Sequence, residues 1–230
     1  MIMSDECFIK DTCGKYKSNR CSCDGSFCLK LFKLNRMYDE ALISASQRKH
    51  VTFRLDSNRC DYEAFTKLAD IESHIEEFVN NGKSLLLNSS ICGNGKTAWS
   101  LRLVQSYFEA IWHRCDLSCQ ALFVNVPRLL LALKDNISDP SDYVKHIKDN
   151  ILTAPLVVWD EVGVKALSEY EHEHLLNFIN ARIDMQKANI YTSNMNALQL
   201  KEKLGERLFS RVYNLSTIIT LYGSDKRGIL

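Results

Sequence analysis

The chain has 230 residues and a formal net charge of +1, with 46% hydrophobic and 25% charged residues. This length allows one well-buried domain with a small appendage. The composition lies in the range of folded proteins, so we do not expect a disordered chain. The near-neutral charge excludes a basic surface over the whole molecule, so any contact with nucleic acid has to come from a local patch.

The sequence contains no apolar run of about 20 residues, and its first residues lack the profile of a signal peptide. We therefore expect a cytoplasmic protein with no membrane partner, whose cysteines are thiols or metal ligands. Five of its nine cysteines precede residue 29. This asymmetry predicts a cysteine-rich module at 1–46, a linker at 47–60 and a main domain at 61–230.

The first 28 residues carry too few aliphatic side chains to build a core, so another source of folding energy is needed. Zinc bound by thiolates would supply it, although the tight Cys-x-x-Cys pairs of common zinc modules are absent. Cys28 is preferred to Cys23 as a ligand because it adjoins an amphipathic helix expected at about 29–46. The predicted zinc ligands are Cys7, Cys13, Cys21 and Cys28. Free or redox-active cysteines remain the alternative.

In the main domain, short apolar runs alternate with amphipathic stretches. A first helix is expected from Asp61, as its cap, to about Val79. Strands are expected at 84–88, 121–126, 156–159, 190–192 and 218–222, and further helices at about 97–113, 127–134, 140–150, 167–184 and 197–213. The alternation predicts an α/β fold with a doubly wound parallel sheet, covered by helices on both faces.

A phosphate-binding loop is predicted at residues 90–97, between an apolar strand and a helix. The glycines let backbone N–H groups point at phosphate, Lys96 suits the β and γ oxygens, and the Thr97 hydroxyl suits magnesium. Ser90 replaces the usual first glycine, but the chemically active half is intact. The predicted binding residues for ATP and Mg²⁺ are Gly93, Asn94, Gly95, Lys96 and Thr97. A helix start without a ligand is the alternative.

An apolar strand that ends in two carboxylates, Asp160 and Glu161, follows further along the chain. Asp160 is predicted to hold magnesium, and Glu161 to polarise the water that attacks the γ-phosphate. An acidic loop after a strand is the alternative, which the phosphate loop makes less attractive.

Two later features complete the candidate site. Asn194 ends a strand on the edge where open α/β sheets bind ligands, and is a candidate for orienting the attacking water. A turn-forming asparagine is the alternative. Arg207 and Arg211 lie one helical turn apart, so we expect them to project from one face.

The order of these motifs, with Arg227 in a late Asp-x-Arg, resembles the DnaC and DnaI class of bacterial and phage helicase loaders within the AAA+ ATPases. The resemblance covers about residues 61–230. It implies that Asn194 is the sensor 1 residue, Arg211 an arginine finger for a neighbouring subunit, and Arg227 a sensor 2 contact to nucleotide in cis. Because the sequence stops just past Arg227, no C-terminal helical lid is expected.

The resemblance also implies a function: ATP-dependent loading of a DnaB-type replicative helicase onto single-stranded DNA, with docking through the cysteine-rich module. Hydrolysis is then expected to depend on self-assembly. Candidate DNA contacts are Arg128, Lys134, Lys145 and Lys148, although a solvated charged face explains each equally well. An IstB-type transposition helper remains open, as does a nucleotide-gated adaptor; the cysteine module argues against the first, and Glu161 and Arg211 argue against the second.

Overall fold

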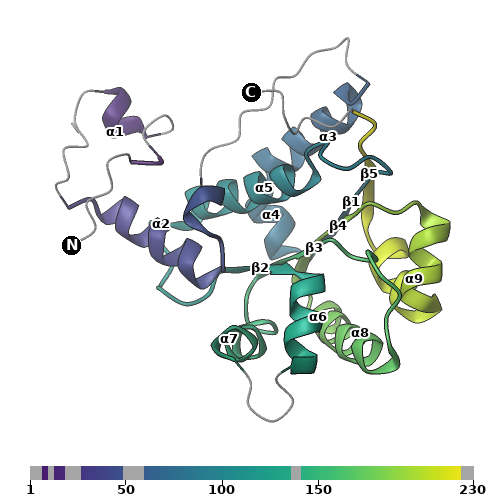
Figure 1. Ribbon diagram of the computed structural model, residues 1–230. Helices are drawn as coiled ribbons and strands as arrows, with labels where there is room; N and C mark the ends of the chain where they lie inside the picture. The colour runs from purple at the N-terminus through teal and green to yellow at the C-terminus, as the bar shows by residue number, and fades with distance from the viewer. Residues whose placement is uncertain (1–6, 10–12, 19–26, 49–59, 136–140, 224–230) are drawn as a thin grey trace.

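The computed structural model describes residues 7–9, 13–18, 27–48, 60–135 and 141–223 (Figure 1). At its centre lies a five-stranded sheet in the order β2-β3-β4-β1-β5, with every neighbouring pair parallel. The strands are β1 (Ser84–Asn88), β2 (Ala121–Asn125), β3 (Leu156–Asp160), β4 (Ala188–Ser193) and β5 (Thr217–Thr220). The predicted parallel sheet is confirmed, and every strand end lies within two residues of the expected position.

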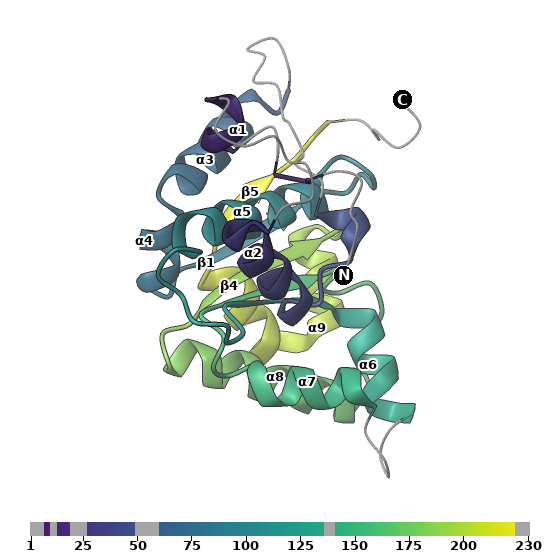
Figure 2. The same cartoon turned by 90° about the vertical axis from the view of Figure 1, so that its left-hand side faces the viewer.

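Two layers of helices enclose the sheet, as Figures 1 and 2 show. One layer contains α2 (Leu29–Glu40), α3 (Tyr62–Ser73), α4 (Ile75–Asn80) and α5 (Lys96–Ile111). The other contains α6 (Val126–Asp135), α7 (Asp142–Asn150), α8 (Glu169–Asp184) and α9 (Ala197–Phe209). A short helix, α1 (Gly14–Lys17), precedes them and has no buried residue.

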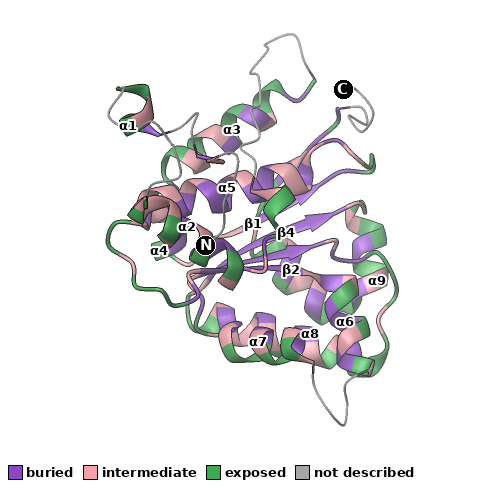
Figure 3. Ribbon diagram, turned by 60° about the vertical axis from the view of Figure 1, so that its left-hand side comes forward, coloured by how far each residue is buried: buried purple, intermediate pink, exposed green. Residues whose placement is uncertain are grey.

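Each helical layer has its own apolar core, because successive side chains of a strand point to opposite faces. Leu85 and Leu87 of β1 join the core under α5, whereas Leu86 joins the core on the other face. In Figure 3, β1 to β4 are almost wholly buried, β5 at the edge of the sheet is partly exposed, and the helices that pack on the sheet expose their outer faces. Among the described residues, no helix combines the length and apolarity that a bilayer span requires.

The strand order brings the predicted motifs together. β4 pairs with β1 on one side and with β3 on the other, in parallel register. The carboxyl ends of these three strands therefore share one edge of the sheet, which is where open α/β sheets bind ligands. The phosphate loop leaves β1 at this edge, and the two carboxylates lie at the end of β3.

The start of the main domain differs from the prediction. The expected single helix is two helices, α3 and α4, which meet at His74 with φ −115° and ψ 29°. Asp61 precedes α3 but makes no side-chain hydrogen bond to its first turn. Its carboxylate instead accepts the backbone N–H groups of Tyr222 (2.5 Å) and Gly223 (2.8 Å). Asp61 therefore ties the start of α3 to the chain just after β5.

The helix expected at 197–213 is also interrupted. Gly205 has φ 72° and ψ 165°, which breaks the helical path within α9. A π-helical turn at Ser210–Asn214 follows. Arg207 and Arg211 are both exposed, but Arg211 lies within the π turn, so the regular one-turn spacing that the sequence predicted does not continue through it.

Helix α2 belongs to the main core, which was not expected of a separate module. Leu34 and Met37 are at most 1% exposed, and the carbonyl of Ala41 accepts the N–H of Phe123 in β2 at 2.8 Å. The helix ends at Glu40, six residues before the expected end. The predicted linker falls mostly outside the described residues, so the domain boundaries stay a prediction.

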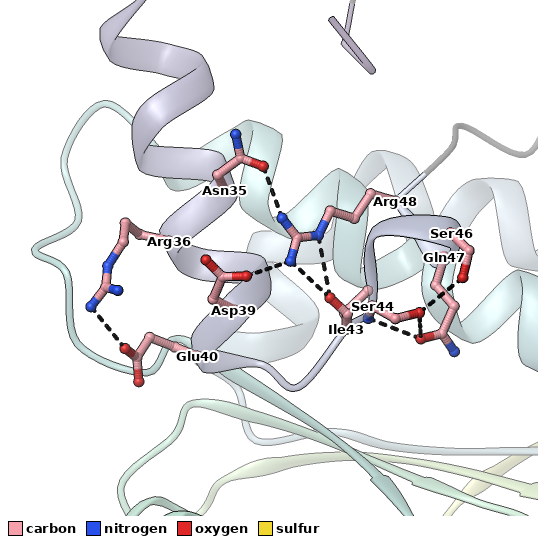
Figure 4. Close-up of polar contacts among 9 residues, drawn as sticks. All are labelled: Asn35, Arg36, Asp39, Glu40, Ile43, Ser44, Ser46, Gln47 and Arg48. Carbon is pink, nitrogen blue, oxygen red and sulfur yellow. Dashed lines mark hydrogen bonds and ion pairs between the residues drawn. The ribbon is translucent and has the colours of Figure 1, made fainter. Parts of the chain in front are cut away.

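The segment after α2 folds back onto that helix (Figure 4). Arg48 donates to the Asn35 side chain at 2.8 Å and to the Ile43 carbonyl, and it forms an ion pair with Asp39. Its guanidinium also lies 5.6 Å from the ring centroid of Tyr38. These contacts fix the chain against α2 up to the last residue described before position 60.

Candidate nucleotide site

The phosphate loop turns from β1 into α5 through two left-handed glycines. Gly93 has φ 71° and Gly95 has φ 106°. Positive φ favours glycine because the Cβ atom of any other residue makes this conformation sterically unfavourable. Lys96 is the first residue of α5, so the N-terminal turn of that helix begins directly at the loop. A helix N-terminus with free N–H groups is suited to bind phosphate.

Lys96 and Asn94 interact inside the loop. The Lys96 ammonium, from a side chain only 6% exposed, donates to the Ile91 carbonyl at 2.8 Å and to Asn94 Oδ1 at 3.0 Å. Asn94 is fully buried and donates to Ser89 Oγ at 2.6 Å and to the Leu221 carbonyl at 3.1 Å. Phosphate oxygens carry more charge than these neutral acceptors and can replace them on the ammonium.

The Thr97 hydroxyl and the Asp160 carboxylate meet directly. Thr97 Oγ1 donates to Asp160 Oδ1 at 3.0 Å, and Thr192 Oγ1 donates to the same oxygen at 2.7 Å. Burial raises the pKa of Asp160 above its usual range, against the lowering effect of these two hydroxyl groups. A hydroxyl and a carboxylate are the hard oxygen ligands that Mg²⁺ prefers. The pair thus fits the predicted magnesium site.

Asp160→Asn is expected to stabilise the protein in the absence of nucleotide. Because the folded-state pKa of Asp160 is raised, its ionised form costs stability, and that cost grows as pH rises through the folded pKa. We expect the variant to melt at a higher temperature than wild type at pH 8, with a smaller gain at pH 4. Thermal unfolding at both pH values checks this, with the exposed Asp149→Asn as control. A variant less stable than wild type at pH 8 would refute it.

Glu161 adopts an unusual backbone conformation immediately after β3. Its φ is 63°, in the left-handed region, which costs a non-glycine residue about 1–2 kcal/mol. Two contacts hold it there: its N–H donates to Thr192 Oγ1 at 2.9 Å, and its Oε2 accepts from Asn125 Nδ2 at 3.0 Å. The structure thus fixes both the backbone and the side chain of the predicted catalytic carboxylate.

Asn125 and Thr192 were missed by the sequence analysis. Asn125 ends β2, and its Oδ1 also accepts the N–H of Arg128 at 3.1 Å, in the first turn of α6. Thr192 lies near the end of β4 and contacts both Asp160 and Glu161. Both are polar residues at the carboxyl ends of central strands, a signal that points to this edge of the sheet.

Three predicted site residues remain: Asn194, Arg211 and Arg227. Asn194 directly follows β4, between the strands of the phosphate loop and of Asp160, and is half-buried. Arg211 is exposed, and its Nε donates to Asn180 Oδ1 of α8 at 2.8 Å. Arg227 lies outside the described residues. The roles assigned to these three residues stay predictions.

The cysteines expected to bind zinc are not brought together where the structure describes them. Cys13 is buried, and Cys7 and Cys28 are half-buried. Within the described ranges, no three histidine, cysteine or acidic side chains form a group that could hold a metal ion. Cys21 and Cys23 lie outside these ranges. The described residues thus do not by themselves make a zinc site.

The candidate DNA-binding side chains differ in whether they contact other residues of the protein. The Arg128 guanidinium lies 4.3 Å from the ring centroid of Tyr143, and Lys134 forms an ion pair with Glu171 at 3.1 Å. Lys145 and Lys148 are exposed on α7. Lys134 therefore has a partner within the protein.

The chain is similar to known proteins in sequence and in fold. No protein-family model matches the sequence. The replicative helicase loader DnaC of Escherichia coli strain K12 is 22% identical over 158 residues, which cover 69% of this chain and 61% of DnaC. The chain thus spans about three fifths of the length of this relative.

The structural similarity extends over more of the molecule. A crystal structure of the DnaC helicase loader superimposes with a TM-score of 0.61 at 19% identity, covering 81% of this chain and 99% of that one. DnaI gives a TM-score of 0.56 at 22% identity, covering 75% of this chain and 87% of that one. The chain has the fold of a DnaC- and DnaI-type helicase loader. The predicted resemblance is confirmed at the level of the fold.

The helicase-loader fold is also similar to a replication initiator. A structure of DnaA bound to AMPPCP and single-stranded DNA has a TM-score of 0.55 at 16% identity, covering 75% of this chain and 49% of that one. The similarity to these structures shows the fold of this chain, in which the phosphate loop and the two carboxylates lie at the same edge of the sheet.

Proposed function

We propose that this protein is an ATPase that loads a DnaB-type replicative helicase onto single-stranded DNA. The observation that carries the proposal is the 3.0 Å contact between Thr97 of the phosphate loop and Asp160 at the end of β3. It joins the two halves of a nucleoside-triphosphate site on a helicase-loader fold. Mere phosphate binding would not require Glu161, whose carboxylate is held in place beside Asp160.

Each residue has a distinct task in this proposal. Lys96 and the N–H groups at the start of α5 bind the β and γ phosphates, and Thr97 and Asp160 would hold Mg²⁺, which supplies positive charge for the phosphate oxygens when bound. Glu161 orients and polarises the attacking water, with Asn194 as a second contact to it. Arg211 reaches the γ-phosphate of a neighbouring copy, and Arg227 contacts nucleotide in the same chain. The active site is complete only after self-assembly.

Arg211→Ala is expected to lower the ATP hydrolysis rate of the assembled protein by about 10³-fold while leaving ATP affinity unchanged, because an arginine finger stabilises charge only in the transition state. Mixing Arg211→Ala with Lys96→Ala protein should partly restore hydrolysis, since intact sites then form between the two variants. Arg207→Ala, an exposed arginine nearby, is the matched control. The prediction is tested by measuring the ATP hydrolysis rate of each variant alone and of the mixture. An absence of restoration in the mixture would place Arg211 outside a shared site.

Loading can be measured directly with a circular single-stranded DNA and the purified replicative helicase. We expect the protein to bind the helicase, and the amount of helicase on the circle to rise when this protein and ATP are both present. The Glu161→Gln protein should retain helicase binding but release helicase slowly. No helicase binding, with binding to a transposase instead, would favour the transposition helper.

Zinc in the cysteine-rich module remains part of the proposal, as the source of order for residues with few aliphatic side chains. We expect about one zinc per chain in the purified protein, from the four thiolates of a tetrahedral site. Cys13→Ser should lower the zinc content, whereas Cys60→Ser, outside the module, should not. Metal analysis that finds no zinc would remove this part of the proposal. Any deletion that tests docking has to stop before α2, because Leu34 and Met37 belong to the main core.

A further inference from the structure

Glu171 is a buried carboxylate in the first turn of α8 that collects four donors. Ser168 donates to its Oε2 through both its N–H (2.8 Å) and its hydroxyl (3.0 Å). The ammonium groups of Lys165 (2.7 Å) and Lys134 (3.1 Å) both bind its Oε1. Burial alone would raise the pKa of Glu171, but these hydrogen bonds lower it to about 2. The side chain is 2% exposed, so this is a fixed, ionised centre.

Its partners come from two parts of the chain: residues 165–168 just before α8, and Lys134 of α6. Ser168 and Glu171 form the capping box of α8, which needs neither lysine. Lys134 comes from the last turn of α6, and Lys165 from the segment that leaves β3 after Glu161. The two ammonium groups therefore add a connection that the helix cap does not require: they join the carboxyl end of α6 to the segment that follows the catalytic carboxylate.

The other end of α6 is joined to the same segment. Asn125 accepts the N–H of Arg128 in the first turn of α6 and donates to Glu161 Oε2. Val162, next in the chain, is pinned to β4 because its N–H donates to the Thr192 carbonyl at 2.8 Å. Helix α6 is thus held at both ends against residues 161–171: through Asn125 at its start and through Glu171 at its end.

We propose that Glu171 is a positioning residue for Glu161: by binding Lys134 and Lys165 together, it fixes α6 so that Asn125 stays aligned on the Glu161 carboxylate. This inference rests on the proposed ATPase. Glu171 itself touches none of the residues that bind phosphate or would hold magnesium. Its loss should therefore change the rate of hydrolysis and leave nucleotide affinity as it was.

The kinetic test compares Glu171→Gln and the double variant Lys134→Met/Lys165→Met with wild type. We expect kcat to fall about 3- to 10-fold, because a general base that is less well oriented loses rate, and the Kd for ATP to stay within about twofold. Asn125→Ala should lower kcat at least as much, and adding Glu171→Gln to it should cause little further loss. Lys201→Met, which removes the exposed Lys201–Glu206 ion pair (2.8 Å) on α9, is the matched control.

A second measurement does not depend on hydrolysis. In hydrogen exchange of the full chain, Glu171→Gln should speed exchange in peptides that cover α6 and residues 161–168, while the Lys201→Met control should not. Faster exchange confined to the first turn of α8 would overturn the inference and leave Glu171 an ordinary helix cap. Unchanged kcat per folded molecule would overturn it as well. If wild type binds ATP but never hydrolyses it, the proposed function fails, and the exchange measurement still decides whether Glu171 holds α6 to the Glu161 segment.

Discussion

Glu161→Gln is expected to lower kcat for ATP hydrolysis by about 10²–10⁴-fold, the usual contribution of a general base. The amide of glutamine has nearly the same shape but does not accept a proton from water. ATP affinity should be unchanged or slightly higher, because the phosphate contacts lie in the loop before α5 and not on Glu161. The left-handed backbone at this position (φ 63°) is equally open to glutamine, so the fold should be unaffected.

Single-turnover hydrolysis and ATP binding, measured on the same preparation, separate these effects. Glu173→Gln, an exposed glutamate of α8, serves as the matched control and should behave as wild type. If Glu161→Gln hydrolyses ATP at more than about a tenth of the wild-type rate, another residue supplies the base and the assignment is wrong.

Arg182→Leu is expected to cause the largest loss of stability of any single substitution considered. Arg182 is fully buried in α8 and donates to the carbonyls of Ile151 (2.6 Å), Ala154 (2.9 Å) and Ala188 (2.6 Å), and to the Asn189 side chain (2.8 Å). One guanidinium thus donates hydrogen bonds to the end of α7 and to the starts of β3 and β4. Burial lowers its pKa to about 10, so it stays charged at neutral pH.

Leucine would fill part of the space but would leave the three backbone carbonyls buried without this donor, whereas the Asn189 side chain would keep the Trp159 Nε1–H at 3.1 Å. We expect a loss of about 3–5 kcal/mol in the free energy of unfolding, and a melting temperature lower by roughly 10 °C. Arg36→Leu, an arginine on α2 whose side chain is 48% exposed, should change stability by less than about 0.5 kcal/mol. Urea unfolding of both variants checks the difference. Equal stabilities would show that the buried acceptors find other partners.

The order of strands and helices was predictable because it depends on local patterns. Apolar runs such as residues 84–88 and 156–159 carry their own signal, since strands of a parallel sheet are buried on both faces. The break at His74 and the π turn at 210–214 were not predictable, because packing decides them and hydrophobic spacing continues through both. Asp61 looked like a helix cap, but its bonds to Tyr222 and Gly223 span most of the chain.

The candidate site likewise has residues that the sequence predicted and residues that it did not. The phosphate loop and the two carboxylates follow from short motifs whose chemistry is local. Asn125 carries no motif, and Thr192 stands in the motif that ends in Asn194 but was given no role. Their contacts with Glu161 and Asp160 exist only because β2, β3 and β4 are neighbours in the sheet. Arg182 gave no signal at all, since an arginine at a helix end is normally exposed.

Direct titration with ATP tests the central claim, which is that residues 90–97 and Asp160 form a nucleoside-triphosphate site. Wild-type protein should bind a fluorescent ATP analogue saturably and more tightly with Mg²⁺ than without it. Lys96→Ala should weaken that binding by about 100-fold, because a buried ammonium that meets phosphate is worth about 1.5–3 kcal/mol or more. Saturable binding that is unaffected by Lys96→Ala, or no binding at all with Mg²⁺ present, would contradict the claim.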